Sequence, residues 1–200
     1  MKAQRRNAKN LGLIFVISGP SGSGKSTLLD KLLQEKELKN RFARSISCTT
    51  RPQRSNERDK KDYFFISDKE FRNRRREKKF LEWTRYLGYY YATAKEFVEN
   101  QLKAGKHILL CLDIRGALRI KQLYPDNNVT IFLLPPSLEA VRERIAGRCP
   151  RTKKEEIQHR LRLARKEFAA ARNYDYCIVN QELRSSLQEF KSIILKEIDA

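Results

Sequence analysis

The chain alternates between short apolar runs and amphipathic stretches of helical period. The apolar run over 11–18 is followed by a glycine-rich loop and then by leucines spaced as on one face of a helix. Further apolar runs of strand length, separated by helical patterns, occupy 107–113, 129–136 and 175–180. Uninterrupted apolar strands that alternate with helices are typical of a parallel sheet covered on both faces. The pattern therefore predicts an α/β fold built on a doubly wound parallel sheet.

Residues 41–93 interrupt this alternation of apolar strands and amphipathic helices. The segments RSISCTT, DYFFI and FLEWTRYLGYYY favour strands, and the charged segment KEFRNRRREKKF among them favours a helix. We therefore expect a small mixed α/β lobe here, inserted into a core formed by 11–40 and 94–200. The polar, basic stretch within 144–160 is expected to form a lid, and residues 1–10 a basic arm.

The composition is strongly basic, with 43 Lys and Arg against 24 Asp and Glu, a formal net charge of +19. Such a charge attracts nucleotides, nucleic acid or acidic lipid, and does not choose among them. The four cysteines form no CxxC pair, so neither a zinc site nor a disulfide framework is indicated. No apolar run approaches the roughly 20 residues of a membrane helix, and the N-terminus lacks a cleavage signal. We therefore expect a cytoplasmic protein with no membrane partner.

The loop GPSGSGKST matches the phosphate-binding pattern G-x-x-x-x-G-K-[ST], with a strand before it and a helix after it. The positive charge of Lys25 can stay in contact with a phosphoryl group while the group is transferred, and the Ser26 hydroxyl can coordinate Mg²⁺. Asp113, at the end of a strand, could serve Mg²⁺ through water or simply cap a turn. We expect the loop to bind ATP through Gly19, Pro20, Ser21, Gly22, Ser23, Gly24, Lys25, Ser26 and Thr27.

Six further motifs follow this loop in register: S-x-T-T-R-x-x-R, D-Y-x-F, F-[IL]-E, G-x-Y-Y-x-[ST], D-x-x-G-A and I-V-N. Together with the loop, they resemble guanylate kinase over nearly the whole chain. The resemblance implies a P-loop NTPase fold whose inserted lobe binds GMP. It also implies Mg²⁺-dependent transfer of phosphate from ATP to GMP, with dGMP expected as a second acceptor.

The residues suit that acceptor chemically. Arg51 and Arg54 can fork onto the monophosphate, with hydrogen bonds added by the hydroxyls of Tyr63 and Tyr91. The Glu82 carboxylate can accept both N1–H and N2–H₂ of guanine, donors that adenine does not offer. The resemblance implies that Ser47, Thr93 and Asp113 complete the contacts to the base.

The resemblance also implies lid arginines that close over the phosphates, namely Arg144, Arg148 and Arg160. Arg160 is in register only if one extra residue is allowed before it. Asn180 falls where the family contacts adenine, although a turn residue at a strand end is an open alternative. Thr93 also fits a capping box for the helix that follows, and Glu82, Tyr63 and Tyr91 could be ordinary strand residues.

Several positions depart from the family pattern, including Pro52, Asn56 and Lys60, and together they point to a divergent enzyme. Three further departures fall in motifs of the expected site. Ala92 replaces a glycine beside the paired tyrosines, Cys111 replaces the first acid of the Asp113 strand, and Arg115 replaces a glutamine. The loss of that acid weakens the case for Mg²⁺ coordination through this strand, where Asp113 is the acid that remains. Altered rate or substrate tolerance is therefore expected.

Three other functions compete with this one. A related kinase could act on ribose 1,5-bisphosphate, but the guanine-reading set of Ser47, Glu82 and Thr93 argues against it. A non-catalytic peptide-binding module would need neither Lys25 nor Ser26. Nucleic-acid binding through RNRRREKK and the basic arm is expected to be non-specific at most, because no nucleic-acid module is present. ATP and GMP are therefore the expected partners of a monomer or homodimer.

Overall fold

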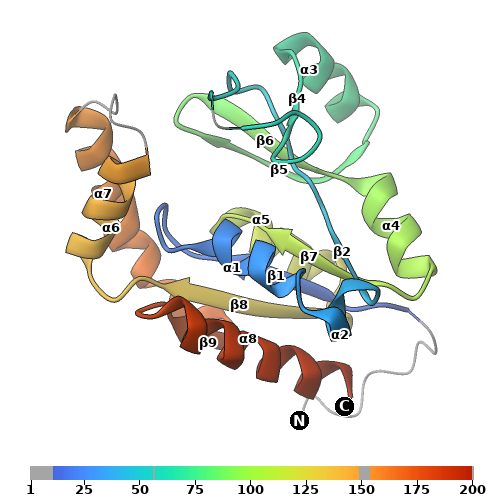
Figure 1. Cartoon of the computed structure of the whole chain (residues 1–200). Coiled ribbons are helices and arrows are strands. Elements are labelled where there is room, and N and C mark those ends of the chain that lie inside the picture. The colour runs from blue at the N-terminus through green and yellow to red at the C-terminus, as the bar shows by residue number, and fades with distance from the viewer. Residues whose placement is uncertain (1–10, 56, 149–153, 200) are drawn as a thin grey trace.

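A parallel sheet of five strands forms the centre of the molecule, in the order β2-β7-β1-β8-β9 (Figure 1). The computed structural model describes residues 11–55, 57–148 and 154–199, without the side chains of Arg148 and Lys154. The five strands are β1 (Ile14–Ser18), β2 (Phe42–Arg44), β7 (His107–Cys111), β8 (Asn128–Leu134) and β9 (Tyr176–Val179). This sheet confirms the predicted fold class. The expected basic arm (1–10) and residues 149–153 of the expected lid lie outside the described residues.

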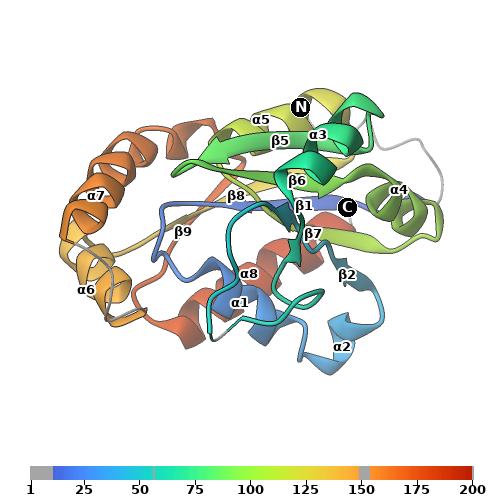
Figure 2. The same ribbon diagram turned by 90° about the horizontal axis from the view of Figure 1, so that it is seen from above.

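The central strand β1 is buried on both faces. Phe15 and Ile17 pack into one apolar cluster, and Ile14 and Val16 pack into another on the opposite face. The first cluster is closed by α1 (Lys25–Leu32), α2 (Lys36–Lys39) and α8 (Leu183–Ile198), and the second by α4 (Lys95–Lys103) and α5 (Ile114–Leu123) (Figure 2). A strand covered on both sides has no face for water, which explains its uninterrupted apolar run.

A second, mixed sheet of four strands lies above the core sheet in Figure 1, in the order β4-β3-β6-β5. β3 and β4 pair in parallel, whereas β6 pairs antiparallel with β3 and with β5. Helix α3 covers one face of this sheet through Phe71, which stacks on Phe80 and Tyr90. The elements of this lobe are β3 (Cys48–Thr49), β4 (Phe64–Phe65), α3 (Asp68–Arg76), β5 (Phe80–Tyr86) and β6 (Tyr89–Ala94).

The segment RSISCTT does not form one strand of the lobe, as the sequence suggested. Arg44 instead ends β2, which pairs with β7 in the core sheet, and the lobe sheet is entered only at Cys48. Phe42 explains the difference, because its buried ring packs against Phe15 of the central strand. Residues 42–44 therefore belong to the core sheet and not to the lobe.

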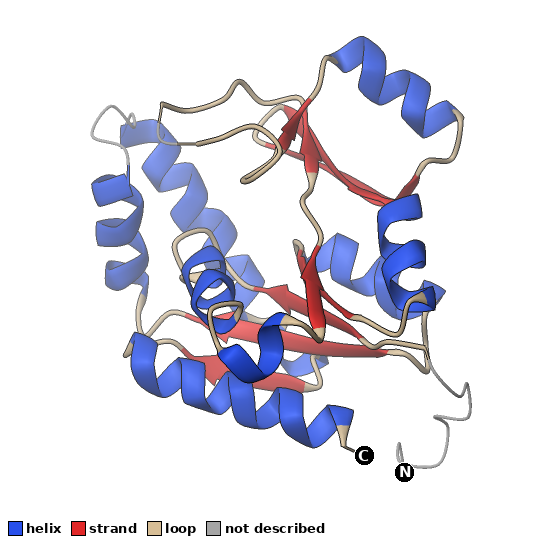
Figure 3. Cartoon of the chain, turned by 45° about the vertical axis from the view of Figure 1, so that its right-hand side comes forward, coloured by secondary structure: helices blue, strands red, loops and turns tan. Residues whose placement is uncertain are grey.

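Two antiparallel helices stand beside the core sheet, α6 (Leu138–Arg148) and α7 (Lys154–Phe168) (Figure 3). They pack on each other through Val141, Ile145 and Ala164. α6 follows β8, and a short helical turn, η1 (Ala171–Asn173), joins α7 to β9. No helix in the described part of the chain is long and apolar enough to cross a membrane.

Candidate active site

One large cavity, of about 1570 Å³, lies between the core, the lobe and the helix pair α6–α7. It brings together most of the residues predicted from the sequence for the site. Those that line it are Gly19, Ser21, Gly22, Gly24, Lys25, Ser26, Thr27, Ser47, Arg51, Arg54, Tyr63, Glu82, Tyr91, Asp113, Arg144, Arg160 and Asn180. Pro20, Ser23 and Thr93 are buried behind this lining, and the side chain of Arg148 lies outside the described residues.

The glycine-rich loop between β1 and α1 needs glycine at two tightly packed positions. Gly19 has a φ of +145° and Gly24 a φ of +95°, values that L side chains rarely adopt. A Cβ at Gly19 would lie 2.2 Å from the Leu133 carbonyl oxygen, and one at Gly24 would lie 2.3 Å from Nδ2 of Asn180. Glycine at these positions lets the backbone of the loop pack tightly at the N-terminus of α1. Backbone N–H groups and the helix dipole at such a terminus favour the binding of phosphate.

Asn180 braces this loop from the end of β9. Its Nδ2 donates a hydrogen bond to the Ser23 carbonyl oxygen at 2.7 Å, and the side chain is buried. The backbone oxygen of Asn180 accepts a bond from Nη2 of Arg144 at 3.2 Å. The contact to adenine stays a prediction, and the structure gives Asn180 a positioning role as well.

Lys25 lies inside the loop. Its Nζ donates to the carbonyl oxygens of Gly19 at 2.7 Å and Pro20 at 2.8 Å. A carboxylate that the sequence did not single out, Glu167 of α7, lines the same cavity. Burial raises the pKa of Glu167 above its usual range, and although the positive charge of Lys25 opposes this, the charge of Asp113 adds to it. Anionic and cationic groups therefore face each other at the glycine-rich loop end of the cavity.

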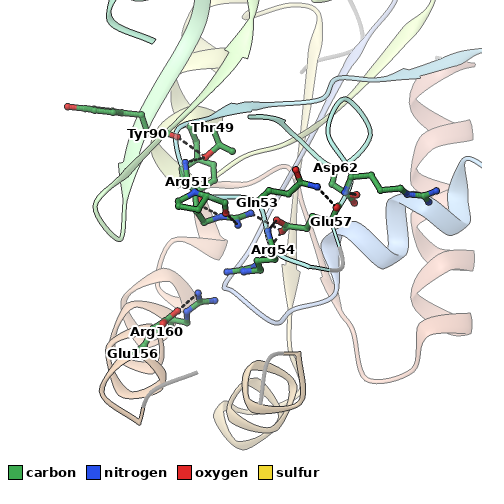
Figure 4. A network of polar contacts seen from close by, with 12 residues as sticks. Thr49, Arg51, Gln53, Arg54, Glu57, Asp62, Tyr90, Glu156 and Arg160 are labelled. Carbon is green, nitrogen blue, oxygen red and sulfur yellow. Dashed lines mark hydrogen bonds and ion pairs between the residues drawn. The ribbon is translucent and has the colours of Figure 1, made fainter. Parts of the chain in front are cut away.

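A network of charges joins residues of the segment that follows β3 in the lobe (Figure 4). Nη2 of Arg51 donates to Glu57 at 2.8 Å, and its Nε donates to the Tyr91 hydroxyl at 3.1 Å. The same carboxylate accepts a bond from the Arg54 backbone N–H at 3.0 Å. Burial raises the pKa of Glu57, but bonds and charges from Arg51 and Arg54 outweigh it and lower the pKa overall. Glu57, missed at the sequence level, thus holds both arginines in place.

Glu82 forms the opposite end of the lobe site. Its side chain is only 6% exposed, and the Thr93 hydroxyl donates to its Oε1 at 2.5 Å. The pKa of this carboxyl is raised to about 7, mainly by burial, with the bond from Thr93 opposing the shift and the charge of nearby Asp113 adding to it. A Cβ at Gly116 would lie 2.9 Å from Oε2, so a larger residue at this position of α5 would displace the carboxylate from its place.

The sequence left open whether Thr93 and Asp113 serve only as helix caps, and the structure answers the two cases differently. The Thr93 side chain does not cap α4, because Ala94 occupies the N-cap and the hydroxyl bonds Glu82 instead. Asp113 does cap α5, accepting a bond from the Gly116 N–H at 2.8 Å, and it also lines the cavity.

Glu82→Gln is expected to stabilise the fold at alkaline pH. Because folding raises the pKa of this carboxyl from 4.5 to about 7, the fold favours its protonated form. Stability is therefore lost progressively as the pH rises from 4.5 to about 7, and the full cost of ionising the buried group is present above 7. Removing the charge should raise the free energy of unfolding by on the order of 2 kcal/mol at pH 8, or the melting temperature by about 5 °C.

Thermal melting of both proteins at pH 8 and at pH 5 checks this expectation, with the exposed Glu96→Gln as a matched control. The gain should shrink towards pH 5 and be absent in the control. An equal gain at both pH values would mean that ionisation of Glu82 is not its cause.

The lid arginines tie α6 and α7 to the glycine-rich loop. Nη1 of Arg160 donates to the Ser21 hydroxyl at 3.0 Å, and its Nη2 donates to Glu156 at 2.5 Å (Figure 4). Nη1 of Arg144 reaches the Gly22 carbonyl oxygen at 3.5 Å. The one-residue offset that the sequence required for Arg160 therefore leads to a side chain in the cavity.

Two of the three departures that fall in motifs of the expected site face this cavity. Ala92 and Cys111 line it, and Ala92 is buried within the lobe sheet. Arg115 is exposed on α5 and lies outside the cavity lining. The replacement of glutamine by a cation therefore adds no charge to the lining of the site.

Comparisons with known proteins agree with this geometry. The guanylate kinase family model matches residues 12–197. A guanylate kinase of Caldanaerobacter subterraneus is 42% identical over 94% of this chain and 89% of its own length. One from Thermotoga maritima is 42% identical over 93% of this chain and 87% of its own. The crystal structure of guanylate kinase from Anaplasma phagocytophilum superposes with a TM-score of 0.77 at 29% identity, covering 94% of this chain and 87% of that one. The chain therefore belongs to the guanylate kinase family.

Proposed function

We propose that this protein transfers the terminal phosphoryl group of ATP to GMP, giving ADP and GDP. A single observation carries the proposal: one cavity joins the glycine-rich loop around Lys25 to an arginine pair and to a buried carboxylate. These three parts match a triphosphate, a monophosphate and a guanine edge in turn. We expect dGMP as a second acceptor, because the groups assigned here address the base and the phosphate.

The base end explains selectivity. The Glu82 carboxylate offers two acceptor oxygens, and guanine presents two donors in N1–H and N2–H₂. The Thr93 bond fixes Oε1, so the carboxylate does not need to reorganise on binding. Adenine lacks these donors and would leave a buried carboxylate unpaired, which is how such a site rejects the wrong base. Ser47, also in the cavity lining, is assigned to O6 of guanine.

The phosphate end explains the chemistry. Arg51 and Arg54, oriented by Glu57, hold the acceptor dianion, with the Tyr63 and Tyr91 hydroxyls as further donors. That phosphate is already ionised near neutral pH, so no general base is needed. Catalysis then consists mainly of positioning and of charge neutralisation by Lys25 and the lid arginines Arg144, Arg148 and Arg160.

The residues present fit Mg²⁺. Ser26 lies at the start of α1 in the cavity, and Asp113 faces the same space from the end of β7. Mg²⁺ takes few protein ligands and fills its shell with phosphate oxygens and water, so one hydroxyl and one water-bridged carboxylate suffice. The ion would neutralise charge on the phosphates of ATP. Closure of the lobe and of the lid would exclude water and so suppress hydrolysis of ATP.

An ADP-release assay with MgATP and a panel of acceptors tests the proposal: GMP, dGMP, AMP, UMP and ribose 1,5-bisphosphate. We expect rapid release with GMP and dGMP alone. Turnover with ribose 1,5-bisphosphate or AMP would show that the lobe serves another acceptor. Binding of ATP without turnover on any acceptor would point to a binding module.

A further inference from the structure

The lobe sheet has a second face, turned away from the cavity. Side chains alternate along β5, so Glu82, Thr84 and Tyr86 line the cavity. Trp83 and Arg85 lie between them in the sequence and project to the other side, where Trp83 meets Phe71 of α3 at 6.1 Å between ring centroids. This outer face is therefore separate from the proposed kinase site.

Aromatic rings and guanidinium groups alternate across this outer face. The Arg75 guanidinium carbon lies 4.7 Å from the centroid of the Trp83 ring, and that of Arg85 lies 5.7 Å from the Tyr90 ring. Trp83 and Tyr90 meet edge to face at 5.9 Å, and Phe71 stacks under Tyr90 at 4.4 Å. Trp83 is nevertheless 44% exposed, an unusual fraction for so large a ring.

The same face carries an excess of positive charge. Glu70 and Glu77 are already paired with Arg74 and Lys79. For Arg72, Arg75, Arg76 and Arg85, no ion pair with a carboxylate is found within the described residues. A hollow of about 430 Å³ between α3 and α4 is also lined by cations, namely Arg74, Lys78, Lys79 and Lys95, together with Glu96 and Glu99.

We propose that this outer face, formed by Arg75, Trp83, Arg85 and Tyr90, binds single-stranded nucleic acid, together with the exposed Arg72 that precedes Arg75 by three residues on α3. Bases stack on the exposed Trp83 ring or on the planar Arg75 guanidinium, and the neighbouring arginines hold the phosphates. Stacking on aromatic rings and on guanidinium planes within a basic surface is the general way in which proteins bind single strands without sequence preference.

The chemistry selects this occupant over two others. Duplex bases are stacked inside the helix and cannot reach the Trp83 ring, so a duplex would use the charges alone. A membrane surface would need several exposed apolar side chains beside the cations. Among the described residues of this face, Trp83 is the only large, mainly apolar side chain that is exposed.

The chain offers an internal probe, because Trp83 is its one tryptophan. Titration with a 20-nucleotide oligo(dT) lacking a 5′-phosphate is expected to quench its fluorescence. With about four phosphate contacts, log K should fall with log[salt] at a slope of about −3. Removing three arginines in R72Q/R75Q/R85Q should weaken binding at least about tenfold and reduce the slope by about 2.

A triple variant on the opposite side of the core, K36Q/K39Q/R184Q, removes the same charge from α2 and α8 (Figure 1). It should weaken binding less than about twofold, and both triple variants should keep the full rate of ADP release with GMP. Equal losses in the two variants would mean that net charge, and not this face, binds the oligonucleotide. Binding without quenching of Trp83, or binding to phosphatidylglycerol vesicles alone, would also overturn the proposal.

Discussion

Replacing Lys25 with alanine is expected to lower the turnover number by about a thousandfold. The Lys25 ammonium already lies in the glycine-rich loop, 2.7 Å from the Gly19 oxygen and 2.8 Å from the Pro20 oxygen. Negative charge shifts between the donor and acceptor oxygens during transfer, and a fixed cation at this point stabilises that change. Steady-state release of ADP with saturating ATP and GMP measures the loss.

Two further variants separate charge from structure. Lys25→Gln keeps a donor for the two carbonyl oxygens but removes the positive charge, so it should be as inactive as alanine and melt like the wild type. Lys31, exposed on the same helix α1, provides the matched control, and Lys31→Ala should keep full activity. An active Lys25→Gln enzyme would contradict the role of the charge in phosphoryl transfer.

The central sheet could be predicted because strands that are covered on both faces must be apolar at nearly every position. β1 and β7 are covered by helices on both sides, so their sequences are apolar at nearly every position, and glycines mark the loop that follows β1. β2 escaped prediction because it has only three residues, too few to show a period. Its place depends on Phe42 packing against Phe15, a contact between residues far apart in the sequence.

The cationic residues of the site could be predicted from motif spacing, whereas the carboxylates that orient them could not. Glu57 follows Arg54 by three residues, but its bond to Arg51 forms only because the loop folds back on itself. Glu167 follows Arg160 by seven residues, two helical turns, which places both on one face of α7. That spacing was a usable signal, although α7 carries two other glutamates, Glu155 and Glu156.

The direction of single side chains also lay beyond the sequence. Arg115 and Gly116 are neighbours at the start of α5, yet Arg115 points to solvent and Gly116 faces the Glu82 carboxylate. A helix turns by about 100° per residue, so neighbouring positions meet different surroundings, and only the packing of α5 on the lobe decides which one faces the site.

Replacing Glu82 with glutamine is expected to lower kcat/KM for GMP by about a hundredfold or more, with little change in ATP binding. A glutamine side chain has one acceptor oxygen and one donor nitrogen, whereas the guanine edge presents donors at both N1 and N2. Because the Thr93 hydroxyl bonds Oε1, the side chain cannot turn freely to avoid placing an N–H against an N–H. The preference for GMP over AMP should therefore shrink, as measured by ADP release with each acceptor.

The pH dependence of activity toward GMP shows whether Glu82 binds the guanine base or has only a structural role. Since the pKa of Glu82 is raised to about 7 by its burial, the free wild-type enzyme should gain activity toward GMP as the pH rises through 7, because only the ionised carboxylate accepts both donors. GMP also loses a proton in this range, but the same substrate serves the variant, so its own titration cancels in the ratio of the two enzymes. That ratio should rise with pH towards a plateau above 7. A ratio independent of pH, or a Glu82→Gln enzyme with full preference for GMP, would remove Glu82 from the guanine site.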